Sequence, residues 1–295
     1  MGHVIRAEWR RGTHSWRFWA AVTLTLFVFL LAMWQYDNPT WRPLIPRADN
    51  FYKSMLDALG AYLMALWPVV IPVVAALPAG DSVAVDRRRG VDALAITRVG
   101  WTGYLAGKLT GSALVAVAAV ALATGMAAAA AAVAYPVALP KLLGWTFPSM
   151  AQWASEPYSY HISGVFASNY ATTFQAHLFW AAPGLYVALV AIVALWATAS
   201  LSALAVASSA WIRVPVLALA VPVVLFLAGD VVTQGMGRSH LVPSVYAGAY
   251  LWSASPPVGS WWTLGLYWLV PAAAAAGAGA WIGRRREWPP GSVGR

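Results

Sequence analysis

The chain has 295 residues, of which 60% are hydrophobic and only 10% are charged. Soluble globular proteins carry about 25% charged residues, so most of this surface cannot face water, and the composition predicts membrane-spanning segments. Cysteine is absent, which excludes disulfides, thiol catalysis and zinc–thiolate sites.

The amino-terminal residues 1–17 carry Glu8 among several basic residues and lead into the first long apolar run. This pattern predicts an amphipathic helix that enters the first span. The apolar run ends without a small-x-small cleavage site, and it is long enough to cross a bilayer. We therefore interpret it as an uncleaved first helix rather than a signal peptide.

Six apolar runs predict an all-helical integral membrane protein, since most reach the ~20 residues that a ~30 Å hydrocarbon core requires. Backbone polar groups in lipid need internal partners, and the alternation of a transmembrane barrel is missing, which favours helices. The fifth run is short and contains Pro215 and Pro222, so we expect it to be kinked or to continue past Asp230. The predicted spans are residues 18–34, 59–79, 108–135, 178–207, 214–229 and 262–283.

Lysine and arginine positions predict that both ends of the chain lie in the cytoplasm. Of the 19 lysine and arginine residues, 14 lie in the segment before the first span or in the other segments that we place on the same side of the membrane. The remaining five lie in the segments on the opposite side. Such an excess marks the cytoplasmic side, and an even number of spans agrees with it. Because the basic residues flank apolar runs, we assign the net charge of +9 to membrane topology rather than to nucleic-acid binding.

Three segments on the outer side are longer than a minimal connection: residues 35–58, 136–177 and 230–261. They are rich in aromatic residues, proline, serine and glycine, whereas a disordered linker would have few aromatics. We therefore expect ordered extracytoplasmic caps or interfacial helices on the outer leaflet.

Two pairs of glycines, Gly107-x-x-x-Gly111 and Gly279-x-x-x-Gly283, allow helices to approach closely. One interpretation is an interface between subunits or a sliding contact. The other is ordinary packing within the chain.

The inner segment between the second and third spans, residues 80–107, mixes charges with apolar side chains. Six charged residues stand within twelve positions, and Gly90 is placed to interrupt a helix there. The mixture predicts a short amphipathic helix along the inner membrane surface with its charges facing the cytoplasm. Fixing the topology would explain the arginines but not the aspartates, because acidic residues contribute little to orientation.

This inner segment resembles the first cytoplasmic loop of permease subunits in the type-2 ABC exporter family. The family's pattern is an acidic residue, a glycine, a leucine-rich turn, a Thr/Ser–Arg pair and aromatic-x-x-Gly-Lys. It is matched here by Asp86, Gly90, Leu94, Thr97-Arg98, Tyr104 and Gly107-Lys108. The sequence RAEWRRGTHSWRFW resembles the family's amphipathic first helix, and the six-span layout extends the similarity over the chain. The outer segments 35–58 and 136–177 are longer than the family's pattern, in which the ordered outer region corresponds to 230–261.

The resemblance implies a transport subunit that is not itself an enzyme and lies in the bacterial cytoplasmic membrane. Such permeases pair with a second permease, the same or related, and bind two copies of a separate ATPase that holds ATP and Mg²⁺. It also implies a pathway between the first, second and fifth spans, and an inner loop that acts as the coupling helix in a groove of the ATPase. By that match the coupling residues are Asp81, Asp86, Arg87, Arg88, Arg89, Gly90 and Asp92. Substrate and substrate-binding residues are not predicted.

The nearest approach to a phosphate-binding loop is WTGYLAGKLT. The pattern G-x-x-x-x-G-K-[ST] requires glycine and serine or threonine where this chain has Thr102 and Leu109. The sequence therefore predicts that energy comes from a partner or from an ion gradient.

Three alternatives stay open. A gradient-driven transporter usually needs ionisable residues inside its spans, and Lys108 and Asp230 lie at span edges, where snorkelling or solvation accounts for them. An anchoring or immunity subunit would need no transport chemistry. An intramembrane enzyme is the third, but no known motif joins its candidate residues, so no catalytic, metal or cofactor site is predicted. Those candidates are Glu156, His161, His177, Asp230 and His240.

Overall fold

The computed structural model describes residues 1–37, 51, 55, 59, 67–134, 182–212, 214–236, 243 and 261–286. Within these residues the chain is helical and contains no strand. The helices are α1 (Gly2–Thr13), α2 (Trp16–Asp37), α4 (Trp67–Ala76), α5 (Ser82–Arg88), α6 (Val91–Ala134), α10 (Pro183–Ser209), α11 (Pro215–Gly235) and α13 (Trp261–Arg286). Most of the three predicted outer segments lies outside the described residues.

Four of these helices are long and apolar enough to cross a membrane, which is consistent with a multi-pass membrane protein. Their apolar stretches are Trp16–Met33, Val91–Ala134, Gly184–Ser209 and Pro215–Thr233. As expected for the fifth predicted span, α11 continues past Asp230 and ends at Gly235. The second predicted span is described from residue 67 onward as α4, and the sixth coincides with α13.

The helices α6 and α10 form the centre of the bundle. Helix α10 contacts α4, α5, α6, α11 and α13, and α6 also contacts α1 and α2. Small side chains such as Ala119, Ala123 and Ala197 are fully buried there, so these helices pack closely. One polar contact links the two central helices, because the Ser112 and Ser202 hydroxyls lie 2.8 Å apart. The spans are therefore held together mainly by the fit of small apolar surfaces.

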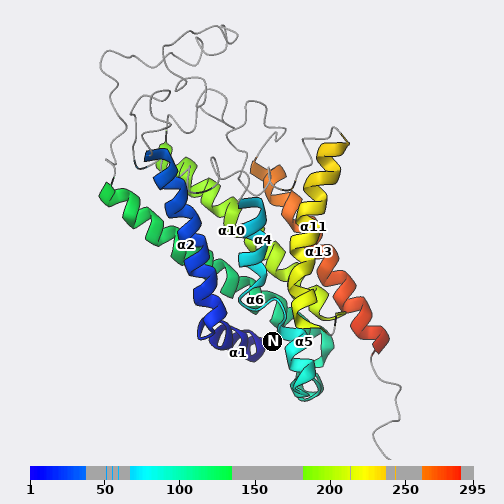
Figure 1. Cartoon of the computed structure of the whole chain (residues 1–295). Coiled ribbons are helices and arrows are strands. Elements are labelled where there is room, and N and C mark those ends of the chain that lie inside the picture. Colours follow the sequence, from blue (N-terminus) through cyan, green and yellow to red (C-terminus); the bar gives the residue numbers. More distant parts are fainter. Residues whose placement is uncertain are drawn as a thin grey trace, which may run out of the picture.

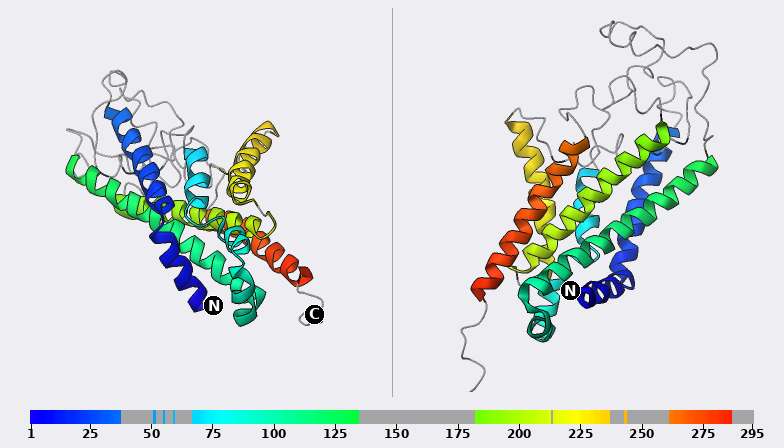
Figure 2. Two further views of the ribbon diagram at one scale, coloured as in Figure 1. Left: turned by 60° about the horizontal axis from the view of Figure 1, so that its bottom comes forward. Right: turned by 180° about the vertical axis from the view of Figure 1, so that it is seen from behind.

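Helix α1 crosses the base of the bundle, transverse to α2 (Figure 1; Figure 2, right). The chain turns between them at His14 and Ser15, and the Ser15 hydroxyl accepts a hydrogen bond from the Phe18 N–H at 3.2 Å. This is the contact that a serine N-cap makes at the start of a helix. The carboxyl end of α13 lies at the same end of the bundle as α1 (Figure 1).

Glycines bring α1 into close contact with α6. A Cβ added at Gly107 would lie 2.7 Å from Cβ of Val4, and one at Gly111 would lie 2.7 Å from Cβ of Glu8. A Cβ at Gly279 of α13 would likewise lie 2.8 Å from Leu105 of α6. The close contacts of Gly107, Gly111 and Gly279 are therefore made within the chain.

Two glycines shape the turn that follows α5. Gly90 has a φ of 68°, so α5 ends at Arg88 and a new helix begins at Val91, as the sequence predicts. Gly100 has a φ of 71° and kinks α6 between a short first part, residues 91–99, and the long span. This short first part and α5 form a helical hairpin at the same end of the molecule as α1 (Figure 1).

Replacing Gly107 with alanine tests the packing of α1. We expect Gly107→Ala to lower the free energy of unfolding by about 1–3 kcal/mol, because the added methyl group overpacks the contact with Val4. Gly125→Ala is the matched control on the same helix, since a Cβ there meets nothing within 4 Å. The control should be neutral or slightly stabilising. Denaturant titration in mixed micelles measures both variants, and equal stability of the two would contradict the close packing.

Candidate functional site

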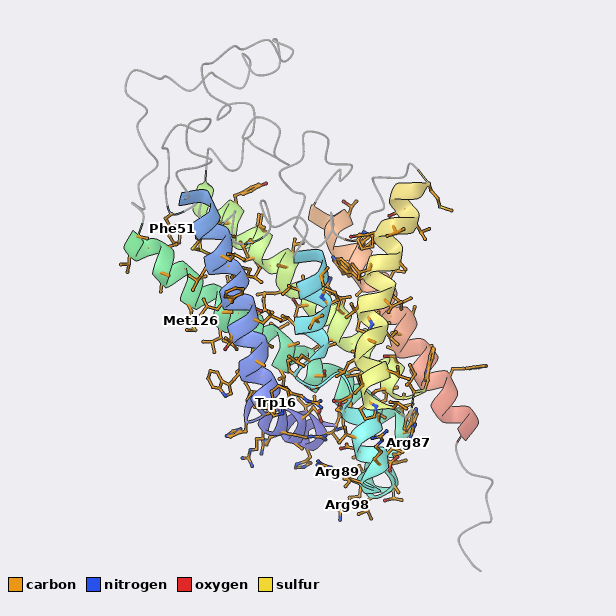
Figure 3. All side chains as sticks on the ribbon, viewed as in Figure 1. Trp16, Phe51, Arg87, Arg89, Arg98 and Met126 are labelled. Carbon is orange, nitrogen blue, oxygen red and sulfur yellow. The ribbon has the colours of Figure 1, made fainter. Side chains whose placement is uncertain are left out.

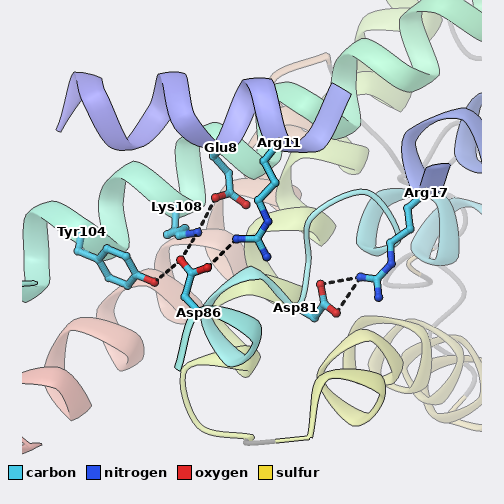
Figure 4. A network of polar contacts seen from close by, with 7 residues as sticks. All are labelled: Glu8, Arg11, Arg17, Asp81, Asp86, Tyr104 and Lys108. Carbon is cyan, nitrogen blue, oxygen red and sulfur yellow. Dashed lines mark hydrogen bonds and ion pairs between the residues drawn. The ribbon is translucent and has the colours of Figure 1, made fainter. Parts of the chain in front are cut away.

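At the base of the bundle, four charged side chains and one tyrosine from three helices meet in a mostly buried group, which we call the charge cluster: Glu8 and Arg11 of α1, Asp86 of α5, and Tyr104 and Lys108 of α6 (Figure 4). Residues three or four positions apart share a helix face, so Glu8 and Arg11, like Tyr104 and Lys108, reach the cluster together. The close packing of Gly111 against Glu8 brings the two helices near enough for their side chains to bond.

Lys108 occupies the centre of the charge cluster. Its ammonium Nζ lies 2.5 Å from Oε2 of Glu8 and 2.6 Å from Oδ2 of Asp86. The Lys108 side chain is only 4% exposed, and the Glu8 side chain 3%. Removing such ions from water costs several kcal/mol for each, and good pairing geometry is needed to offset that cost. Lys108 is therefore held by two carboxylates rather than by water.

Asp86 completes the pairing from α5. Its Oδ1 accepts a hydrogen bond from Nη1 of Arg11 at 2.6 Å, and its Oδ2 accepts one from the Tyr104 hydroxyl at 2.9 Å. The cluster thus contains two carboxylates, one ammonium and one guanidinium, and its formal charges cancel. A buried polar network is stable when every member has a partner.

The surroundings shift the pKa values of two members outside the spans. Burial alone would raise the pKa of Asp86, but the Lys108 ammonium and the Arg11 guanidinium outweigh burial and hold it below its usual value. Burial would lower the pKa of Arg11, but the carboxylates of Glu8 and Asp86 outweigh burial and raise it. Both side chains are therefore charged at neutral pH.

A second ion pair ties the start of α2 to the chain before α5. Nη1 of Arg17 donates to both carboxylate oxygens of Asp81, each at 2.8 Å. The Asp81 side chain is 3% exposed, whereas that of Arg17 is 33% exposed. Together with the charge cluster, this pair connects α1, α2, α5 and α6 at one end of the bundle (Figure 4).

Arg87 joins the hairpin to α10. Its Nη1 and Nη2 donate to the carbonyl oxygen of Ala210, each at 3.2 Å, at the carboxyl end of α10. A guanidinium there hydrogen-bonds a carbonyl at the end of the helix and opposes the negative end of the helix dipole. Nε of Arg87 also lies 3.7 Å from Oδ2 of Asp92.

The outer part of the hairpin presents what we call the basic tip, composed of Arg88, Arg89, Val91, Leu94 and Arg98. All five are exposed, and Leu94 is 68% exposed despite being apolar. Val91, Leu94 and Arg98 stand three and four residues apart, so they share one helix face. Figure 3 shows Arg89 and Arg98 at the base of the molecule, where α1 also lies. The tip is thus an apolar patch with arginines around it.

The structure divides the seven predicted coupling residues into three sets. Arg88, Arg89 and Gly90 are exposed at the hairpin turn, whereas Asp81 and Asp86 are buried and paired within the chain. Arg87 and Asp92 are half-buried and lie close to each other. The expectation that all the charges of the segment face the cytoplasm therefore does not hold for the two buried aspartates.

The interpretation of Lys108 as a snorkelling side chain is wrong, because Lys108 is buried and carries two carboxylate partners. The sequence analysis did not assign site roles to Glu8, Arg11, Arg17 or Tyr104. One sequence signal points to part of the cluster: a lysine followed by a long apolar run needs a carboxylate partner, and Glu8 is the only acid of α1.

The candidates for an intramembrane enzyme are mostly beyond the described residues, as Glu156, His161, His177 and His240 are. Asp230 is described and is buried on α11 rather than solvated. Among the described residues, no group of three or more histidine or acidic side chains is placed to hold a metal ion.

Two apolar cavities lie beside α10. The larger measures about 890 Å³ and is lined by α10, α11 and α13, with Trp211, Phe226 and Trp268 among its walls. The smaller measures about 780 Å³ and lies between α6, α10 and α13. Ser200 of α10 borders both cavities.

Comparison of the chain with known protein families, with curated proteins and with solved structures found no match. The functional argument therefore rests on the charge cluster and on the basic tip.

The two aspartates Asp86 and Asp92 offer a direct test of the division between buried and surface charges. We expect Asp86→Ala to lower the free energy of unfolding by about 3–5 kcal/mol, because it leaves Lys108 and Arg11 with one carboxylate between them. Asp92→Ala removes the same group from a half-buried position 3.7 Å from its cation and should cost about 1 kcal/mol or less. Denaturant titration in mixed micelles compares them, and similar losses would contradict the assignment.

Proposed function

We propose that the chain is the membrane-spanning permease subunit of an ATP-driven exporter of the ABC type, coupled to a separate ATPase. The observation that carries the proposal is the basic tip: exposed Val91 and Leu94, flanked by arginines, at the end of a hairpin fixed to the bundle. An exposed apolar patch of this kind is typical of a surface that binds a partner. A groove with apolar walls and an acidic rim on the partner would complement it.

The segment that comes nearest to a phosphate-binding loop supports the proposal that a separate partner binds ATP. The segment WTGYLAGKLT lies within helix α6, so its backbone N–H groups do not form a phosphate cradle. Lys108 of that segment is already held by Glu8 and Asp86. In the proposal, ATP and Mg²⁺ are bound by two copies of the partner ATPase, and this chain supplies the pathway.

The proposed route for the signal runs from the basic tip through the hairpin. Just beyond the kink at Gly100, Trp101 and Tyr104 pack with Val83 of α5 and Val206 of α10. The Trp101 indole N–H also donates to the carbonyl oxygen of Gly279 on α13 at 3.2 Å. A displacement of the tip would therefore press on α10 and α13 through rigid contacts rather than through a loose loop.

The proposal includes six spans in a bacterial cytoplasmic membrane, with both termini and the basic tip in the cytoplasm. Two features support this orientation: the excess of basic residues on one side, and the placement of α1, the hairpin and the end of α13 together (Figure 1). Two permease copies, or this chain with a related one, would enclose the pathway.

Co-purification in mild detergent tests the proposal. We expect the tagged chain to retain a soluble protein that hydrolyses ATP. The double variant Arg88→Glu/Arg89→Glu should lose this protein and its activity at least tenfold, because charge reversal turns attraction at the rim into repulsion. Leu94→Asp should lose it as well, since it removes the exposed apolar contact.

The matched control is Arg6→Glu/Arg10→Glu, which reverses the charge of two exposed arginines at the same end of the molecule but outside the tip. It should retain the ATPase, and all variants should keep the parent's unfolding midpoint. If the chain purifies alone, or if the tip variants retain the ATPase, the proposal is overturned, and gradient-driven transport becomes the next hypothesis to measure.

A further inference from the structure

Helix α1 has an outer face that the charge cluster does not use. Glu8 and Gly12 point toward α6, and Gly12 approaches Val115 so closely that an added Cβ would lie 2.7 Å from it. On the opposite face, Arg6 and Arg10 stand four residues apart and are exposed. Helix α1 itself lies across one end of the bundle of spans (Figure 2).

The charged side chains on the outer face of α1 are all basic. Glu8 is the only acidic residue of the helix, and it is buried against Lys108. Within the described part of the chain, neither the Arg6 nor the Arg10 guanidinium has a carboxylate partner. The pairing inside the cluster therefore leaves uncompensated positive charge outside, which complements an anionic surface.

Three exposed tryptophans place this face at the depth of the lipid headgroups. Trp9 is 41% exposed, Trp16 is 72% exposed and Trp19 is 56% exposed. Trp16 projects outward from the base of α2 (Figure 3). An indole prefers the boundary where its ring is in the apolar layer and its N–H meets water. Arginines adjacent to this boundary lie level with the lipid phosphates.

We propose that the outer face of α1 binds the phosphodiester headgroups of anionic phospholipids. Arg6 and Arg10 contact the phosphate oxygens, and Trp9 and Trp16 pack at the glycerol level beside them. A guanidinium suits this role because its fork of N–H donors matches two phosphate oxygens at once. This interaction is separate from any partner ATPase, and it would hold even if the chain had none.

The absence of cysteine from the chain makes the measurement clean. A single exposed cysteine, Ala7→Cys, takes an environment-sensitive dye on the outer side of α1. The full chain in neutral detergent is then titrated with short-chain phosphatidylglycerol, with phosphatidylcholine of the same chain length, and with inorganic phosphate.

Phosphatidylglycerol should bind at least tenfold more tightly than phosphatidylcholine, and inorganic phosphate should not change the dye signal. Each arginine removed should weaken phosphatidylglycerol binding about fivefold, so Arg6→Ala/Arg10→Ala should weaken it about 25-fold. Arg88→Ala/Arg89→Ala, the matched control with the same loss of net charge at the basic tip, should leave it unchanged.

Three results would overturn the proposal. Unchanged phosphatidylglycerol binding in Arg6→Ala/Arg10→Ala would show that these arginines are not the site. An equal loss of phosphatidylglycerol binding in Arg88→Ala/Arg89→Ala would show that binding depends on the net charge of the protein and not on a site at α1. Tight binding of inorganic phosphate would identify a free-anion site instead of a lipid site. An unchanged unfolding midpoint in each variant ensures that a loss of binding is not a loss of fold.

Discussion

The buried ammonium of Lys108 is the constraint on which the base of the molecule depends. An unpaired charge at this depth would cost several kcal/mol, and the two carboxylates that neutralise it come from other helices, Glu8 from α1 and Asp86 from α5. Docking these three helices together therefore offsets the cost of burying the charge on Lys108. The close fit of glycines along α6 provides the short distance that this pairing requires.

The same pairing determines which charged side chains remain exposed on the surface. Glu8, Asp81 and Asp86 are used inside, so the charges left outside on α1 and at the hairpin turn are mainly arginines. These arginines form two surfaces of different character. On α1 they lie beside exposed tryptophans, which suits a lipid headgroup layer, whereas at the basic tip they surround an exposed leucine, which suits a protein. Within the described residues, one internal network thus leaves both proposed binding surfaces, the outer face of α1 and the basic tip, with unpaired arginines.

The sequence predicted an all-helical membrane protein, because length and apolar content determine whether a segment can cross a bilayer, and four of the described helices meet that requirement. It also predicted the break at Gly90, which requires a positive φ, and the continuation of α11 past Asp230. It did not predict that Asp86 is buried. Two residues that bond to Asp86 are Arg11, which lies 75 positions away along the chain, and Tyr104, which lies 18 positions away. No helical spacing rule relates residues that are so far apart in the sequence. Composition shows which charges exist, but only tertiary packing decides which of them are paired.

A double-mutant cycle on Glu8 and Lys108 tests the central claim, that this pair holds α1 to the bundle, most directly. The free energy of unfolding is measured for Glu8→Gln, for Lys108→Met and for the double variant. Each single change leaves a buried charge short of a partner, whereas the double change removes both charges, so the account predicts a coupling free energy of about 1–3 kcal/mol. If the two single effects simply add to within about 0.5 kcal/mol, the pair does not hold the helices together, and the account is contradicted.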